Sequence, residues 1–233
     1  MKETDLNYAK DMANMLLSLD VEETEFEAFL IHPFLTQRFM LINRNDKDLT
    51  DILKDDNIKL AREKFANLIA ESQDIWHIYC YMHKPYRALY FKLIYDHLSE
   101  KDYNTFLKNV WIDSENPNQD PNVKINAWIN FYKKSNKNLI MSESELEVYN
   151  NLPDDELITI YRGVGPGREQ FGLSWTKNIK TAKWFANRWN NKNPYIIKAQ
   201  CFKKDIFAYF NERSEDELVV NVKKIINIER IQL

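Results

Sequence analysis

The chain has 233 residues, of which 44% are hydrophobic and 29% are charged, and its formal net charge is −3 at pH 7. This composition predicts a globular protein with a sizeable core and excludes an intrinsically disordered chain, and such a charge gives no general attraction to nucleic acid. No run of about 18 apolar residues occurs, and the first residues, MKETDLNYAKDM, lack the apolar stretch of a secretory signal. We therefore expect a cytoplasmic protein without a membrane partner.

The residues that most often bind metals or form disulfides are few and scattered. Cys80 and Cys201 are the two cysteines, and they lie far apart without metal-ligand spacing. The four histidines form no cluster with other ligating residues. We expect neither a disulfide framework nor a metal site.

The first 150 residues have the periodicity of amphipathic helices. Apolar residues recur at helical spacing through FANLIAESQDIWHIYCYM, residues 65–82, and the pattern continues in PYRALYFKLIYDHL, residues 85–98. Helix starts are predicted at Ser99, at Asp120 before a proline, and at Ser142, which Glu145 follows in a capping-box pattern. We expect residues 1–150 to be a helical region.

After Pro153 the pattern changes to the alternation that is typical of strands. The predicted strands are ELITIYRG, GLSWT, PYIIKAQC, DIFAYF, ELVVNV and KIINIERIQL, and TAKWFANRW is predicted to be one short helix. The chain is thus expected to be α+β, with a second region at residues 151–233. The formal charge is −7 over residues 1–150 and +4 over residues 151–233, which favours an anion-handling role for the second region.

The glycines point to a specific place in this second region. All four lie between Gly163 and Gly172, within the stretch YRGVGPGREQFGLSWT, residues 161–176. Glycine is favoured where the backbone takes a positive φ or where another group approaches the main chain closely. A ligand site formed by the backbone is therefore predicted at this turn.

Polar side chains flank the glycine turn at strand spacing. In a strand, residues two apart share a face, so Ser174 and Thr176 are expected to face a cleft while Trp175 packs inward. Glu215 and Glu217 share a face by the same rule if their strand includes both. Together with Arg162, these side chains are expected to converge on one cleft.

The order of an arginine, a Ser-x-Thr pair, an aromatic-plus-arginine helix and a Glu-x-Glu pair resembles the mono-ADP-ribosyltransferase superfamily. The resemblance is to its Arg–Ser–Glu branch, which includes cholera-toxin-like and iota-toxin-like enzymes and related phage transferases, and it covers roughly residues 150–233. It implies an antiparallel or mixed β core with a short helix. It also implies an enzyme that cleaves the nicotinamide–ribose bond of NAD and transfers ADP-ribose to a protein acceptor in a bacterial cell, with arginine as the expected acceptor residue.

The resemblance assigns roles to residues of the first two strands of this region. By this likeness, Arg162 holds phosphate or ribose oxygens of NAD, and the backbone of Gly163 binds the nicotinamide carboxamide. Ser174, Trp175 and Thr176 stand where the family has its Ser-Thr-Ser motif, so Ser174 is expected to orient the catalytic glutamate. The central tryptophan departs from that motif.

The remaining roles fall on the short helix and the last acidic pair. Phe185 is expected to stack on nicotinamide and Arg188 to meet phosphate. Glu217 matches the catalytic glutamate, and Glu215 matches the acidic residue that accepts the proton of an arginine nucleophile. Glu212 stands where related enzymes carry an aromatic residue that recognises the acceptor, which leaves the acceptor open.

Two other interpretations of the sequence remain open. The same site could use water or a nucleic-acid base as acceptor, giving an NAD glycohydrolase or a nucleic-acid-directed transferase; the lack of a strongly basic helix in residues 1–150 disfavours nucleic acid. Alternatively, the chain is a non-catalytic interaction protein with a transferase-like fold. Residues 1–150 are expected to recognise the target or to shield the site, and the sequence leaves open whether the protein is a toxin, a phage effector or a regulator.

Overall fold

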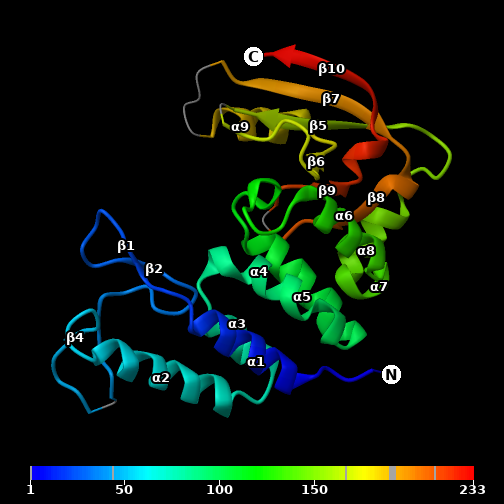
Figure 1. The fold of residues 1–233 in the computed structure, drawn as a ribbon. Helices are drawn as coiled ribbons and strands as arrows, with labels where there is room; N and C mark the ends of the chain where they lie inside the picture. Colours follow the sequence, from blue (N-terminus) through cyan, green and yellow to red (C-terminus); the bar gives the residue numbers. More distant parts are fainter. Residues whose placement is uncertain (1, 44, 166, 189–192, 213) are drawn as a thin grey trace. The chain divides into compact units, whose positions relative to one another are not determined.

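The chain folds into two compact units, residues 1–114 and residues 115–233 (Figure 1). The computed structural model describes residues 2–43, 45–165, 167–188, 193–212 and 214–233. These parts of the chain form nine α-helices and a six-stranded antiparallel sheet, which confirms the expected α+β class. Among the same residues, no helix is both long and apolar enough to cross a membrane.

The first unit is built on five α-helices. They are α1 (Leu6–Leu17), α2 (Asn57–Glu71), α3 (Ile75–Tyr81), α4 (Lys84–Ile94) and α5 (Glu100–Asp113). The apolar stripe predicted over residues 65–82 is divided between α2 and α3, because the Asp74 carboxylate caps the backbone N–H groups of Trp76 and His77 and starts a new helix there. The predicted start at Ser99 is confirmed, since its side chain accepts from the N–H of Asp102.

The described residues of this segment, 18–43 and 45–56, are not helical, so the expectation of a helical region throughout residues 1–150 is wrong there. Two small two-stranded sheets form instead, β1 (Glu22–Glu23) with β2 (Leu30–Ile31), and β3 (Phe39–Met40) with β4 (Thr50–Asp51). The segment still contributes to a core: Leu30, Leu35 and Ile52 are buried together with Ala61 of helix α2. Tertiary packing of these side chains thus outweighs the weak helical pattern.

The second unit begins with three α-helices, α6 (Ile125–Lys134), α7 (Lys137–Ile140) and α8 (Glu143–Asn150). The predicted capping box of Ser142 and Glu145 is confirmed. The helix predicted to start at Asp120 begins five positions later, because the Asp120 carboxylate accepts from the N–H groups of Asn122 and Val123 and closes a separate turn.

The six-stranded sheet follows in the second unit. Its strands are β5 (Ile158–Val164), β6 (Ser174–Thr176), β7 (Tyr195–Cys201), β8 (Ile206–Phe210), β9 (Glu217–Val220) and β10 (Ile226–Gln232). They confirm the six predicted strands, and α9 (Ile179–Asn187) confirms the short helix between them. The strand order is β10-β7-β5-β6-β9-β8, so β5, β6 and β9 are neighbours although they are separated in sequence.

The boundary between the two compact units lies at Ser114 and Glu115, earlier than the division at residue 150 that the change of pattern predicts. Helices α6 to α8 pack against strand β8, which explains the difference. The Tyr132 and Phe207 rings stack at 5.7 Å, and the Glu145 carboxylate accepts from the N–H of Asn211 at 3.0 Å. The second unit therefore includes helices whose sequence pattern resembles that of the first.

His32 is a buried titratable group in the first unit. Its Nδ1 accepts from the N–H groups of Phe34 and Leu35 at 3.0 and 2.9 Å, which requires the neutral ring. Burial, with a smaller contribution from the charge of Arg62, lowers the pKa of His32 from 6.5 to about 4. The folded state therefore binds this proton less readily than the unfolded state does.

We predict that this histidine makes the first unit acid-sensitive. Because the pKa is lower in the folded state, the stabilisation is complete above pH 6.5 and is lost as the pH falls towards 4. The free energy of unfolding should fall by up to about 1.4 kcal/mol per pH unit in that range. Urea unfolding at a series of pH values measures this slope. His32→Asn, which keeps an acceptor for the same turn, should flatten it; an unchanged slope would contradict the assignment.

Candidate active site

Strands β5, β6 and β9 carry the three motifs that the sequence singles out. Tyr161 on β5 lies directly opposite Thr176 on β6, and Thr176 lies directly opposite Glu217 on β9. Ser174 is likewise opposite Val219. Residues that are directly opposite in an antiparallel pair share a face, so Ser174, Thr176 and Glu217 lie on one face of the sheet.

The side chains on this face differ in burial. Thr176 is buried, and its Oγ1 accepts from the N–H of Asn178 at 3.1 Å at the start of helix α9. Ser174 and Glu217 are half-buried. Trp175 lies on the opposite face, is buried, and donates from Nε1 to the Gly172 carbonyl, which confirms the predicted alternation of this strand.

Arg162 is placed differently from the expected constellation. The alternation along β5 puts it on the face opposite Tyr161, and hence opposite Ser174, Thr176 and Glu217. The side chain is buried. The charge of Glu217 nevertheless acts on it: this carboxylate is one of the groups that favour the charged guanidinium.

The guanidinium of Arg162 binds the main chain rather than open space. Its Nη1 donates to the carbonyl of Ser174 at 2.7 Å, and its Nη2 and Nε donate to the carbonyl of Glu169 at 2.9 and 3.3 Å. Burial first, and Arg168 second, lower the pKa of Arg162 to about 10, so the group stays charged at neutral pH. This clasp, as we call the three hydrogen bonds, joins the glycine-rich turn to strand β6.

Two of the glycines owe their place to close packing. A Cβ at Gly163 would clash with the Ala182 carbonyl of helix α9 and lie 2.6 Å from the nitrogen of Ala186. A Cβ at Gly172 would lie 2.7 Å from Nη2 of Arg162 and 2.6 Å from the side-chain nitrogen of Asn118. Helix packing therefore explains Gly163, and the clasp explains Gly172. The sequence had suggested a different reason for these glycines, the close approach of a ligand.

Helix α9 brings the two predicted cofactor contacts beside strand β5. The Cβ of Phe185 is 3.0 Å from the position that a Cβ on Gly163 would take, and its ring meets Trp184 edge-on at 4.9 Å. Arg188, at the end of the helix, lies over the ring of Trp184 with Cζ 5.3 Å from the centroid. Phe185 is thus next to the strand that carries Arg162, and Arg188 is one turn further on.

The acidic pair is not arranged by strand alternation. Strand β9 begins at Glu217, and Asp216 has a φ of +48°, so the i, i+2 rule that was expected to align Glu215 with Glu217 does not apply. The carboxylate of Asp216 accepts from the hydroxyl of Tyr209 at 2.7 Å. The backbone N–H of Asp216 donates to the side-chain oxygen of Asn211. Glu215 therefore belongs to the turn before the strand, while Glu217 alone has a strand register.

The structure adds three residues that the sequence did not single out. Asn118 and Gln119, from the 3₁₀ turn Pro117–Gln119, bind the glycine-rich segment: Asn118 accepts from the N–H of Leu173 at 2.9 Å, and Gln119 donates to the carbonyl of Gly167 at 2.6 Å. Arg168 has its pKa lowered by burial and then by the charge of Arg188. Arg168 lies within the glycine-rich stretch, so the sequence could have indicated it as a site residue. Asn118 and Gln119 lie far away in sequence, and no pattern around them points to this site.

Comparison of the chain with protein-family models, with curated proteins and with solved structures finds no match in any of the three. Within the described residues, no group of three or more histidine, cysteine or acidic side chains could hold a metal ion.

We predict that the clasp stabilises the second unit. Arg162→Lys keeps a positive charge but cannot bind both carbonyls with a planar fork, and hydrogen bonds to a charged group are worth about 1.5–3 kcal/mol. The free energy of unfolding measured in urea should fall by a comparable amount, and residues 165–172 should become easier to cleave in limited proteolysis. Arg230→Lys, an exposed arginine of the same sheet, is the control. Equal stability of the two variants would contradict the clasp.

A second prediction concerns the contact between helix α9 and strand β5. Gly163→Ala places a methyl group against the helix backbone, and overpacking of this kind costs about 1–3 kcal/mol. Thr159→Ala, four residues earlier on the same face of β5, is the control and should cost less. The midpoints of thermal unfolding compare the two variants. A Gly163→Ala protein as stable as the parent would show that the helix does not lie directly on the strand.

Proposed function

We propose that this protein is an NAD-dependent mono-ADP-ribosyltransferase that modifies a protein acceptor, with arginine as the modified residue. The observation that carries the proposal is the sheet order, which makes neighbours of the three strands bearing Arg162, Ser174 and Glu217. The motifs that prompted the resemblance lie apart in sequence, so their adjacency is independent support. The shared face of Ser174, Thr176 and Glu217 adds to it.

The reaction explains the need for a carboxylate at Glu217. Nicotinamide leaves NAD as a neutral base, and positive charge develops on the ribose in an oxocarbenium-like transition state, as in glycoside hydrolysis. A carboxylate about 4 Å from that charge stabilises it by about 4 kcal/mol at an effective dielectric constant of 20. Glu217 is half-buried and shares its face with the Ser174 hydroxyl. In this proposal, Ser174 orients the carboxylate.

The three arginines of the site have different roles in this proposal. Because Arg162 is engaged by main-chain carbonyls, its part in the proposal is to hold the glycine-rich turn against β6. Arg168 and Arg188 supply the charge for the pyrophosphate of NAD. Burial first, and the charge of Arg188 second, lower the pKa of Arg168, and a bound anion would relieve the repulsion between the two arginines. Phe185, next to Gly163, supplies the apolar surface for nicotinamide.

One observation favours a second candidate, a non-catalytic interaction protein with a transferase-like core. The burial of Arg162 and its bonds to carbonyl groups suit a purely structural arginine as well as an active one. This candidate requires no NAD turnover. Release of nicotinamide from NAD by the purified chain separates the two functions directly.

We predict that the two glutamates have different roles. Every acceptor, water included, depends on departure of nicotinamide, so Glu217→Gln should reduce both NAD hydrolysis and transfer to an arginine analogue by about 10²–10³-fold. Only transfer needs a base for the guanidinium, so Glu215→Gln should reduce transfer by about 10²–10⁴-fold and leave nicotinamide release measurable. Rates of nicotinamide release and of transfer are measured for each variant.

Glu229→Gln is the matched control, since Glu229 lies in the same sheet, is exposed, and pairs with Lys198 at 3.0 Å. Full NAD hydrolysis by the Glu217→Gln protein would remove this residue from catalysis. Loss of hydrolysis in the Glu215→Gln protein would leave a transferase but reject the separate roles. No nicotinamide release by the parent chain would favour the interaction protein.

A further inference from the structure

The negative charge of the first unit is concentrated in one segment. Residues 18–56 contain ten Asp and Glu against four Lys and Arg, a net charge of −6. The remaining residues of the unit, 1–17 and 57–114, contain ten of each and are neutral. The segment with the small sheets β1 to β4 therefore carries the whole net charge of this unit.

The same segment exposes large apolar side chains. Phe26 is 72% exposed, Leu49 63% and Phe29 57%, and Ile31 and Leu41 are also exposed. Single exposed apolar residues are ordinary, but several within one short acidic segment indicate a contact surface. Aromatic residues at the centre of such a surface contribute most to protein–protein binding.

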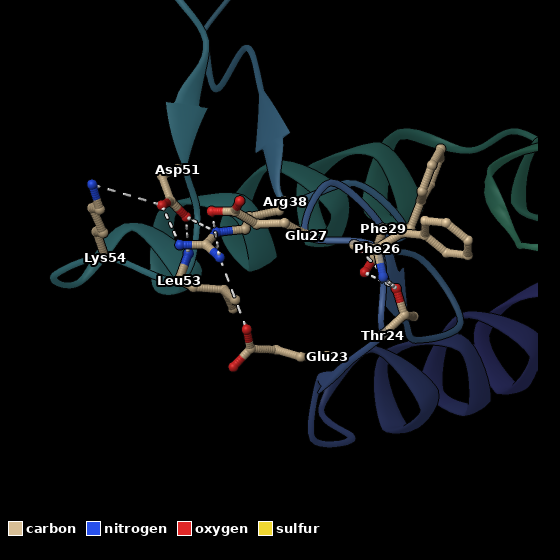
Figure 2. A network of polar contacts seen from close by, with 9 residues as sticks. All are labelled: Glu23, Thr24, Phe26, Glu27, Phe29, Arg38, Asp51, Leu53 and Lys54. Atoms are coloured by element: carbon tan, nitrogen blue, oxygen red, sulfur yellow. Dashed lines mark hydrogen bonds and ion pairs between the residues drawn. The ribbon is translucent and has the colours of Figure 1, made fainter.

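The two phenylalanines project from an ordered turn (Figure 2). Between β1 and β2, the carbonyls of Phe26 and Phe29 lie 2.8 and 3.0 Å from the hydroxyl of Thr24 and share its one proton. The same hydroxyl accepts from the N–H of Phe26. The N–H of Phe29 also donates to the carbonyl of Phe26 at 2.9 Å. We call residues 22–31 the Phe26–Phe29 turn. Because its backbone is already held, binding through it loses little conformational entropy.

Arg38 fixes the acidic side of this turn (Figure 2). Its Nε and Nη2 donate to both oxygens of Asp51 on β4 at 2.9 and 2.8 Å. Its Nη1 lies 3.4 Å from Glu27 and 3.9 Å from Glu23. One guanidinium thus meets three carboxylates, so the turn keeps an excess of negative charge beside its exposed rings.

We propose that the Phe26–Phe29 turn binds a partner protein through a basic, partly apolar surface on that partner. The rings would enter an apolar depression, and the glutamates around them would face arginine or lysine side chains. Opposite charges raise the rate of encounter and select the partner, while burial of the rings supplies most of the affinity. This inference goes beyond the transferase proposal and does not depend on NAD turnover.

Binding of a labelled basic peptide tests the surface on the full-length protein. The probe is a fluorescein-labelled peptide of alternating arginine and leucine residues, with counterparts that carry glutamate for arginine or serine for leucine. Fluorescence anisotropy should show binding of the first peptide only, weakening with salt because exposed charges are screened. Phe26→Ser with Phe29→Ser should raise the dissociation constant by about tenfold or more.

Matched variants on helices α1 and α2, outside the acidic segment, serve as controls. Met15→Ser with Leu60→Ser removes apolar side chains that are also exposed, by 40% and 46%. Glu63→Gln with Glu71→Gln on α2 removes as much charge as Glu22→Gln with Glu25→Gln in the turn. Only the turn variants should weaken binding. Equal weakening by the control variants, or equal binding of the glutamate peptide, would overturn the proposal.

Two further outcomes would assign the surface to another occupant. Concentration-dependent self-association in sedimentation experiments, abolished by the Phe26→Ser and Phe29→Ser changes, would assign it to a second copy of this chain. An increased rate of NAD hydrolysis in the same variant would assign it to the second unit of the same chain. Loss of peptide binding with unchanged hydrolysis supports the proposal, and absence of hydrolysis in the parent chain bears on the transferase alone.

Discussion

The second unit depends on one buried charge, the guanidinium of Arg162. Removing it from water is costly unless its donors find partners, and three of its nitrogens donate to the carbonyls of Glu169 and Ser174. Those bonds oblige the chain after β5 to fold back over the arginine before it enters β6. Gly172 lies beside Nη2, and a Cβ at this position would force the side chains of Arg162 and Asn118 to shift. The turn between β5 and β6 is thus shaped around a charge.

The same constraint organises the residues on the other face of the sheet. With β6 held between β5 and β9, Thr176 comes to lie opposite both Tyr161 and Glu217. A carboxylate, two hydroxyls and helix α9 then share a face, which is the arrangement that the transferase proposal requires. The charge of Glu217 is one of the smaller contributions that favour the charged form of Arg162, so the arginine and the candidate catalytic group interact.

The first unit follows a different principle. Residues 1–17 and 57–114 carry no net charge, whereas residues 18–56 carry a net charge of −6 and several exposed apolar side chains. A segment with that composition forms only a small core, and it relies on Arg38 and Thr24 to order its turns. Such local hydrogen bonds suit a surface that must keep its shape without being buried.

Sequence periodicity by itself determined the strands after residue 153, the helix α9 and the capped starts at Ser99 and Ser142, because these features depend on neighbours within a few residues. It also determined that Ser174 and Thr176 share a face. Only the tertiary structure determined which face of the sheet Arg162 lies on relative to Ser174 and Glu217, because this depends on how strand β5 is aligned with strand β6. Tertiary structure also explains why residue 163 is a glycine, because the backbone of helix α9 lies where a Cβ of this residue would be. The separation of Glu215 from the strand of Glu217 depended on the positive φ of Asp216, a backbone choice that no residue pattern in this acidic run reveals.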